Sequence, residues 1–274
     1  FTAASRSLPG WAVGLSIFGT YLSSNTFLGV PGTAFVGNWN RFVFSLGLPI
    51  AALIAARVFV PFYRKTGEIS AYYHLEHRFG VWARTYAMIC YLLTQLARMG
   101  TIMYAVSLAL SALVGWDNLP AIIVISGTLV TLYTLLGGIE AVIWTDVVQS
   151  IVLTAGAVIV TAMLLWGMPG GPGYFFETAA AHGKFSLGSF SASLSDSTFW
   201  VVLVYGIVMN LNNFGIDQSF VQRYHTAQSH AAAARSVWLS VWLYIPGSAA
   251  FLLIGPALWA CYHHPSQMGT RDEM

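Results

Sequence analysis

Apolar residues fill long stretches of this chain, and polar residues gather in the short segments between them. A run of about 20 apolar residues is what an α-helix needs to cross a bilayer. The pattern therefore predicts seven membrane-spanning helices, and one longer loop at residues 169–198. The predicted spans are residues 8–27, 42–63, 86–114, 119–136, 141–168, 199–221 and 237–262.

Composition supports an all-α membrane protein, because 57% of residues are hydrophobic and only 8% are charged, against about 25% charged in soluble domains. Lys and Arg in short loops favour the cytoplasmic side. A cytoplasmic amino end places seven basic residues inside and three outside, which predicts a multi-pass protein of the plasma (inner) membrane. The inside residues are Arg6, Arg64, Lys65, Arg78, Arg84, Arg223 and Arg235, and the outside ones are Arg41, Lys184 and Arg271.

Two of the predicted spans are interrupted by polar residues and glycine. Residues 19–26 read GTYLSSNT in the first span, and residues 210–218 read NLNNFGIDQ in the sixth. Irregular backbone at membrane depth is tolerated only where it lines a cavity or is buried in protein. Alternatively, the hydroxyls bond the preceding turn and aid helix packing. Because the two spans are five helices apart, an inverted repeat is favoured, with breaks near residues 19–22 and 210–215 and the two spans packed together.

Arg98 is the one charge in the otherwise uncharged run 86–114. A charge near the centre of a membrane helix costs about 2.5–3.5 kcal/mol on insertion scales. Its position therefore indicates an anionic ligand, or a structural partner such as a carboxylate or the carbonyls of a broken helix.

Three motifs resemble the sodium/solute symporter family. They are RSLPGWAVGLS at residues 6–16 followed by SSNTFLG at 23–29, GGIEAVIWTDVVQ at 137–149, and NFGIDQSFVQRY at 213–224. The resemblance implies a LeuT-like inverted-repeat fold. It also implies that residues 1–274 are a partial symporter domain, with the first five-helix repeat at about 1–168 and the start of the second at about 197–262. We expect an internal fragment that lacks the eighth core helix.

The resemblance also implies Na+ as the coupling ion. By position in the motifs, the backbone carbonyls of Gly19 and Leu22 resemble the sodium ligands of the first core helix. Asp146 matches an aspartate that contributes to a second sodium site or an ion exit path in some members. Its other interpretation is a helix N-cap at the start of the fifth span.

For the substrate, the resemblance points to organic acids. Sialic-acid carriers have an arginine at the place of Arg98, where sugar carriers have uncharged groups, and a planar guanidinium suits a carboxylate. Ser45 stands where relatives have a larger polar residue, Arg41 is an unusual charge, and Tyr21 is bulkier than expected. These departures are compatible with a smaller organic anion. The other candidates for the chamber are Ser23, Thr26, Gln95, Asn210, Asn213 and Phe214.

These observations predict a sodium-coupled symporter that imports a small carboxylate-bearing solute, such as sialic acid or a monocarboxylate, by alternating access. The alternatives are a sodium/sugar symporter and a transporter-like membrane sensor. A channel would normally show a filter loop or rings of charge. The sequence has no HExxH or Walker motif and no nucleic-acid-binding signal, so we expect no enzymatic activity, with a small solute and the lipid bilayer as partners.

Overall fold

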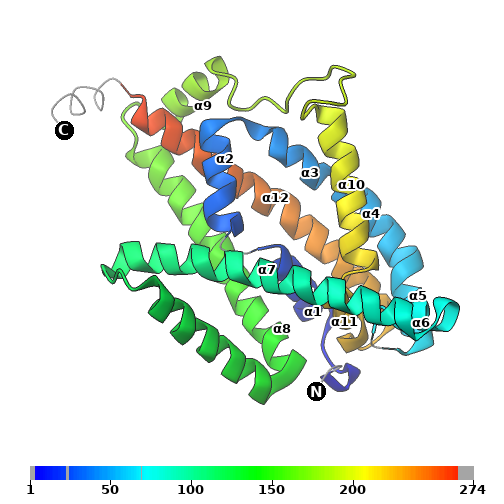
Figure 1. Cartoon of the computed structure of the whole chain (residues 1–274). Helices are drawn as coiled ribbons and strands as arrows, with labels where there is room; N and C mark the ends of the chain where they lie inside the picture. The colour runs from blue at the N-terminus through cyan, green and yellow to red at the C-terminus, as the bar shows by residue number, and fades with distance from the viewer. Residues whose placement is uncertain (1–3, 23–24, 69, 265–274) are drawn as a thin grey trace.

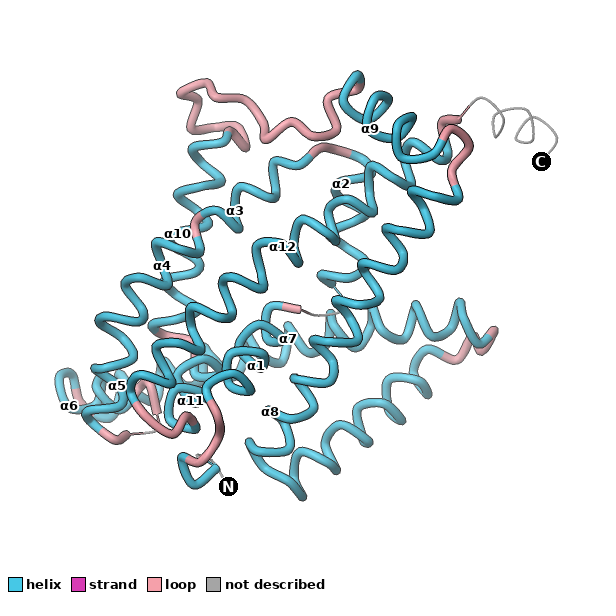
Figure 2. Tube along the Cα trace, turned by 180° about the vertical axis from the view of Figure 1, so that it is seen from behind, coloured by secondary structure: helices cyan, strands magenta, loops and turns pink. Residues whose placement is uncertain are grey.

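In the computed structural model of the chain, residues 4–22, 25–68 and 70–264 are described. They form helices joined by loops (Figures 1 and 2), and their β-structure is limited to a single parallel bridge between Leu8 and Ala227. The α-helices are α1 Gly10–Tyr21, α2 Val30–Val36, α3 Phe42–Leu46, α4 Leu48–Ile54, α5 Val60–Thr66, α6 Tyr73–Phe79, α7 Val81–Val114, α8 Leu119–Gly167, α9 Gly171–Ala181, α10 Phe199–Gly215, α11 Gln218–Thr226 and α12 His230–Tyr262. Short 3-10 helices lie at Ala4–Arg6 and Trp39–Arg41, and π-helical turns at Asn25–Gly29 and Ala55–Phe59.

Four helical segments are long and apolar enough to cross a membrane, and the bent pair of α10 and α11 makes a fifth among the described residues. The four are Trp39–Thr66, Val81–Val114, Leu119–Gly167 and His230–Tyr262. Two predicted spans, the fourth and fifth, lie together in the 49-residue α8, which is kinked at Gly138. The first predicted span, residues 8–27, contains α1 and the start of the π-helical turn Asn25–Gly29, and α2 follows it. Both α1 and α2 are too short to be counted alone.

The first span is broken where the sequence predicts it. Helix α1 ends at Tyr21, and Leu22 has an extended backbone with φ −86° and ψ 124°. The chain resumes as the π-helical turn Asn25–Gly29 and then as α2. The break therefore exposes the carboxyl end of α1 at the middle of the span.

The sixth span is broken slightly later than predicted. Helix α10 continues through residues 210–215 and bends by 53° into α11 at Ile216 and Asp217. The amide of Asn210 stays within the helix, because its Nδ2 donates to the Gly206 carbonyl at 2.7 Å. Asp217 begins the next helix by accepting from the Ser219 N–H at 2.7 Å, which is the usual role of an N-cap.

Two predicted loops are corrected by the structure. Residues 169–198 include the helix α9, which begins after Gly170 in a left-handed conformation. The short loop expected between the fourth and fifth spans is a kink at Gly138, with φ 59° and ψ −156°. A positive φ is a conformation that glycine adopts without the Cβ clash of other residues, so one glycine is enough to turn the helix.

The two broken spans pack beside each other, as predicted. The Tyr21 hydroxyl donates to Asn210 Oδ1 at 3.1 Å, and the Leu8 N–H donates to the Thr226 carbonyl at 3.1 Å. In Figure 1, α12 runs through the middle of the molecule. The amino terminus, α5, α6 and α11 lie at one end, and α9 lies with the far end of α12 at the other.

Helices α3 and α4 approach α10 closely through two glycines. A Cβ added at Gly206 would lie 2.8 Å from the Phe44 carbonyl oxygen, and one at Gly47 would lie 2.8 Å from the Ile207 nitrogen. Small residues of this kind let membrane helices pack backbone to backbone. The contact forms one wall of the cavity described below.

We expect Gly206→Ala to lower the melting temperature of the detergent-purified full-length protein, because overpacking costs about 1–3 kcal/mol. Gly100→Ala is the matched control, since a Cβ there meets nothing within 4 Å. Equal melting temperatures for the two variants would show that α10 can move away from α3 at no cost.

Candidate substrate and ion sites

Most of the predicted site residues line two cavities, which share no lining residue. The first, which we call the α10 cavity, lies between α3, α10, α12 and the start of α2, and has a volume of about 610 Å³. The second, the α7 cavity, lies between α1, α7, α8 and α11, and has a volume of about 810 Å³. Both volumes are in the range of about 300–1,000 Å³ that small-molecule sites occupy.

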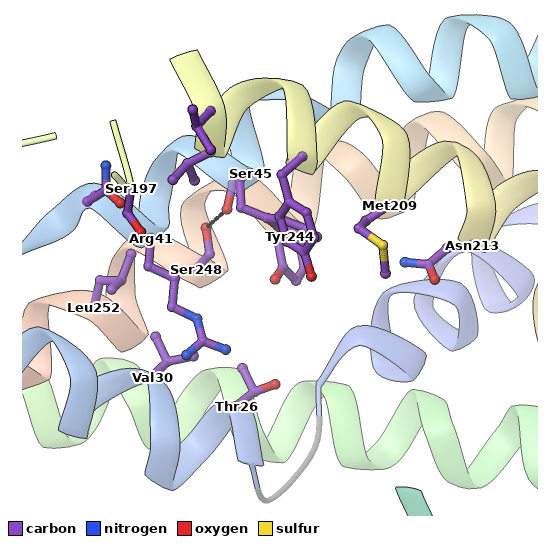
Figure 3. A pocket seen from close by; sticks show the side chains of 15 residues that line it. Thr26, Val30, Arg41, Ser45, Ser197, Met209, Asn213, Tyr244, Ser248 and Leu252 are labelled. Carbon is purple, nitrogen blue, oxygen red and sulfur yellow. Dashed lines mark hydrogen bonds between the residues drawn. The ribbon is translucent and has the colours of Figure 1, made fainter. Parts of the chain in front are cut away.

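The α10 cavity brings together three of the predicted residues, Thr26, Ser45 and Asn213. Figure 3 shows Ser45 beside Ser248, and their Oγ atoms are 2.9 Å apart. The Thr26 hydroxyl donates to the Tyr21 carbonyl at 2.9 Å, next to the break in the first span. This cavity is therefore lined by hydroxyl and amide groups from both broken spans and from α12.

The loop that follows α9 borders the α10 cavity and is fixed to the end of α2. Lys184 is buried, and its Nζ donates to the carbonyls of Phe35 at 2.7 Å and Gly37 at 3.2 Å. Burial lowers the pKa of the Lys184 amine. Asn40 Nδ2 donates to the Leu187 carbonyl at 2.7 Å. The sequence predicted Lys184 to be a loop charge on the outside. In the structure, its hydrogen bonds join the segment after α9 to the end of α2.

The α7 cavity brings together the charged candidates and their neighbours. Arg98, Gln95 and Asp146 line it with the backbone of Gly19 and Leu22. The side chain of Arg98 is exposed to this space, and its Nη2 donates to the Thr20 carbonyl at 3.2 Å. A cation at the carboxyl end of α1 is favoured by the helix dipole.

An aromatic cluster around Tyr21 lies between the two cavities. The Tyr21 ring centroid is 4.8 Å from that of Tyr244, 5.2 Å from Phe220 and 6.2 Å from Phe214. Tyr244 lines the α10 cavity, while the neighbours of Tyr21 in sequence line the α7 cavity. Asn210 and Phe214 are fully buried in this wall and line neither cavity, so their contact with a substrate stays a prediction.

Oxygen donors suited to sodium gather where α1 meets α8. A Cβ added at Gly19 would lie 2.6 Å from Ser150 Oγ and 3.3 Å from the Asp146 carbonyl oxygen, so the α1 backbone lies directly against α8. The Gly19 carbonyl accepts from the Leu22 N–H at 3.0 Å and keeps a second lone pair. Carbonyl, hydroxyl and carboxylate oxygens suit hard cations, so this donor set fits Na+. Ser23 lies outside the described residues.

Asp146 takes part in a largely buried ion pair, in which its own side chain is 17% exposed. Its Oδ2 accepts from Arg223 Nη2 at 2.7 Å and from Ser16 Oγ at 2.5 Å. Arg223 also donates from Nε to Ser16 Oγ at 2.7 Å and from Nη1 to the Ser219 carbonyl at 2.7 Å. The group joins α1, α8 and α11. The N-cap interpretation of Asp146 is wrong, because α8 is helical on both sides of it.

Arg223 is the member of this polar group that sequence reasoning missed. We counted it as a cytoplasmic loop charge because the apolar run ends at Val221, but it is only 6% exposed and lies within α11. The signal was its position in the third motif, within the helix that Asp217 and Gln218 begin.

A helical membrane protein with two broken, adjacent spans and cavities at the breaks has the architecture of an inverted-repeat transporter. The model of the sodium:solute symporter family matches residues 1–273, and the chain belongs to this family.

The chain is 37% identical over 259 residues to the sodium/sialic acid symporter SiaT of Proteus mirabilis (strain HI4320), covering 93% of this chain and 51% of that protein. It is 30% identical over 269 residues to sodium-coupled monocarboxylate transporter 1 of Homo sapiens, covering 96% of this chain and 43% of that protein. The chain thus spans about half the length of the curated relatives it matches.

A solved substrate-bound, outward-open structure of a Na+-coupled sialic acid symporter matches the fold with a TM-score of 0.90 and 34% identity. The match covers 98% of this chain and 57% of that one. It confirms the predicted LeuT-like fold, and the relatives are transporters rather than enzymes.

Proposed function

We propose that the full-length protein is a sodium-coupled symporter that carries a small organic acid by alternating access. The observation that carries this proposal is the α7 cavity, where the Arg98 guanidinium faces the same space as the carbonyl end of α1 and Asp146. Anion and cation sites at the break of one helix are the arrangement expected of a coupled carrier. Relatives named as sodium/sialic acid and sodium-coupled monocarboxylate carriers support an organic acid as cargo.

In this proposal Arg98 binds the carboxylate of the solute. Its guanidinium has five N–H donors, and the structure uses one of them on the Thr20 carbonyl. A planar fork that faces a cavity can form two parallel bonds to a carboxylate. Gln95 lies one turn earlier on the same helix face and lines the same cavity, so its amide can bind a neighbouring polar group.

Sodium is held by the carbonyls of Gly19 and Leu22, and Asp146 serves a second sodium ion or an exit path. Bound sodium would place a positive charge beside the broken helix, and its movement down the sodium gradient would drive uptake of the solute. Asp146 binds Arg223 through Oδ2, and a carboxylate has a second oxygen that can accept an ion. An ion at Asp146 would therefore lie beside the contact between α8 and α11.

The location we propose is the plasma (inner) membrane, with the amino end in the cytoplasm. Figure 1 places the amino terminus, α5, α6 and α11 at one end of the molecule. Those elements contain five of the twelve basic residues, Arg6, Arg64, Lys65, Arg78 and Arg223, and a concentration of basic residues at one end is expected for a cytoplasmic side.

Uptake of a labelled organic acid by proteoliposomes containing the full-length protein is expected to rise with external sodium and to collapse when choline replaces it. Asp146→Asn should raise the sodium concentration for half-maximal uptake, because the neutral amide attracts a cation less strongly. Glu140→Gln, an exposed neighbour on α8, is the control. An unchanged sodium dependence in Asp146→Asn would leave Asp146 with only its structural pair.

A further inference from the structure

Arg41 is the one charged side chain among the 15 residues that line the α10 cavity. Figure 3 shows its guanidinium pointing into the cavity, toward Thr26. The structure gives this guanidinium no hydrogen bond or ion pair with any described residue. All five N–H donors of the Arg41 guanidinium are therefore available to a ligand in this cavity of about 610 Å³.

Nothing among the lining residues neutralises this charge. Of the acidic residues, Asp196 lies nearest in sequence to any lining residue, because it precedes Ser197. It is exposed, however, and accepts from Ser193 Oγ at 2.7 Å. A cation with low-dielectric walls and no counter-charge attracts anions strongly. The cavity is therefore built to hold a negative group rather than a neutral or positive one.

The neutral lining groups indicate what the rest of the ligand looks like. Ser45, Ser248 and Asn213 supply hydroxyls and an amide, and Tyr205 and Tyr244 supply aromatic faces with polar tips. Such groups bind hydroxyl and amide substituents and stack on a ring or carbon chain. The combination fits a hydroxylated organic acid better than a purely apolar one.

The backbone that carries Arg41 is held in place. Asn38 Oδ1 accepts from the Asn40 N–H at 3.0 Å, and the Trp39 ring packs on Phe42 and Phe185 with centroids 5.6 and 5.4 Å apart. A fixed turn with a long side chain pointing into a cavity loses little order when a ligand binds.

We propose that Arg41 anchors a second anion site, in the α10 cavity, that binds the carboxylate of a hydroxylated organic acid. This inference rests on the proposed function, because it assigns a further step to the same solute. The site is separate from Arg98, since the α10 cavity and the α7 cavity share no lining residue. Two arginines, one in each cavity, hold the anion in turn as it passes the broken span.

The test is ligand binding by the full-length protein in detergent, where both sides are accessible, followed as a rise in melting temperature. The ligands are sialic acid, gluconate and lactate, each compared with its methyl ester or amide. Arg41→Gln is expected to weaken binding of the acids about tenfold or more, the loss expected for a charge-assisted bond. Arg41→Lys should retain part of the binding. Arg57→Gln is the control, because Arg57 is exposed and lines neither cavity.

Acid binding by Arg41→Gln that equals that of Arg57→Gln would overturn the inference. So would equal binding of acids and their esters or amides by the wild type. The double variant Arg41→Gln/Arg98→Gln should show additive losses if the anchors are independent. Arg41-dependent acid binding without sodium-dependent uptake would refute the proposed function and support the second site.

Discussion

Arg223→Gln is expected to lower the melting temperature of the full-length protein sharply and to abolish its uptake activity. The Asp146 side chain is 17% exposed, and that of Arg223 is 8% exposed. Removing one partner of a fully buried pair costs about 3–5 kcal/mol, because the other charge is left without compensation, and we expect a cost toward the lower end here because Asp146 is partly exposed. The loss also frees Ser16 and the Ser219 carbonyl, so α1, α8 and α11 lose their common contact.

The size of the effect is checked by a double-mutant cycle. Asp146→Asn/Arg223→Gln should be more stable than Arg223→Gln alone, because the carboxylate that lacks a partner is then neutral. Arg84→Gln is the matched control, since the pair of Arg84 and Glu76 is 2.6 Å apart but 36% and 31% exposed. Exposed pairs contribute about 0–1 kcal/mol. Similar losses for Arg223→Gln and Arg84→Gln would show that the buried pair is not what joins the three helices.

The arrangement of spans could be predicted because it depends on local physics. Apolar runs of membrane length and two polar interruptions are visible in the sequence. The separation of the interrupted spans by five helices follows from them. The position of the second break was wrong because we gave weight to Asn210. That amide is satisfied inside its own helix by the Gly206 carbonyl, whereas the N-cap Asp217 marks the true start of α11.

The division of the site into two cavities could not be predicted. Thr26 and Arg98 were expected to face one pocket, but the pocket in which each residue lies depends on how Tyr21 packs against Tyr244 and Phe220. That packing joins residues far apart in sequence, and no periodicity reports it. The pair of Asp146 and Arg223 was hidden for the same reason, since its two members are 77 residues apart in the sequence.

Uptake of organic acids is expected to fail in Arg98→Gln, with an apparent affinity at least tenfold weaker than that of the wild type. A charge-assisted hydrogen bond contributes about 1.5–3 kcal/mol, and a carboxylate bound by the planar fork forms two. In the wild type, acids should compete for uptake of the labelled solute, while their amides or methyl esters should not. Arg57→Gln, which removes an exposed arginine from another span, should leave this competition unchanged.

The variant Arg98→Lys distinguishes two roles of Arg98, which are binding the solute and stabilising the carboxyl end of α1. The structure shows one bond from Arg98, to the Thr20 carbonyl at 3.2 Å, and a lysine ammonium can donate to such a carbonyl as well. A purely structural Arg98 would therefore be rescued by lysine. A carboxylate clamp would not be, because a point charge lacks the paired donors of a guanidinium. We expect Arg98→Lys to keep the melting temperature near that of the wild type and to transport acids poorly. Uptake of glucose or galactose as efficient as that of any acid, or unchanged acid affinity in Arg98→Gln, would return Arg98 to a structural charge at the end of α1.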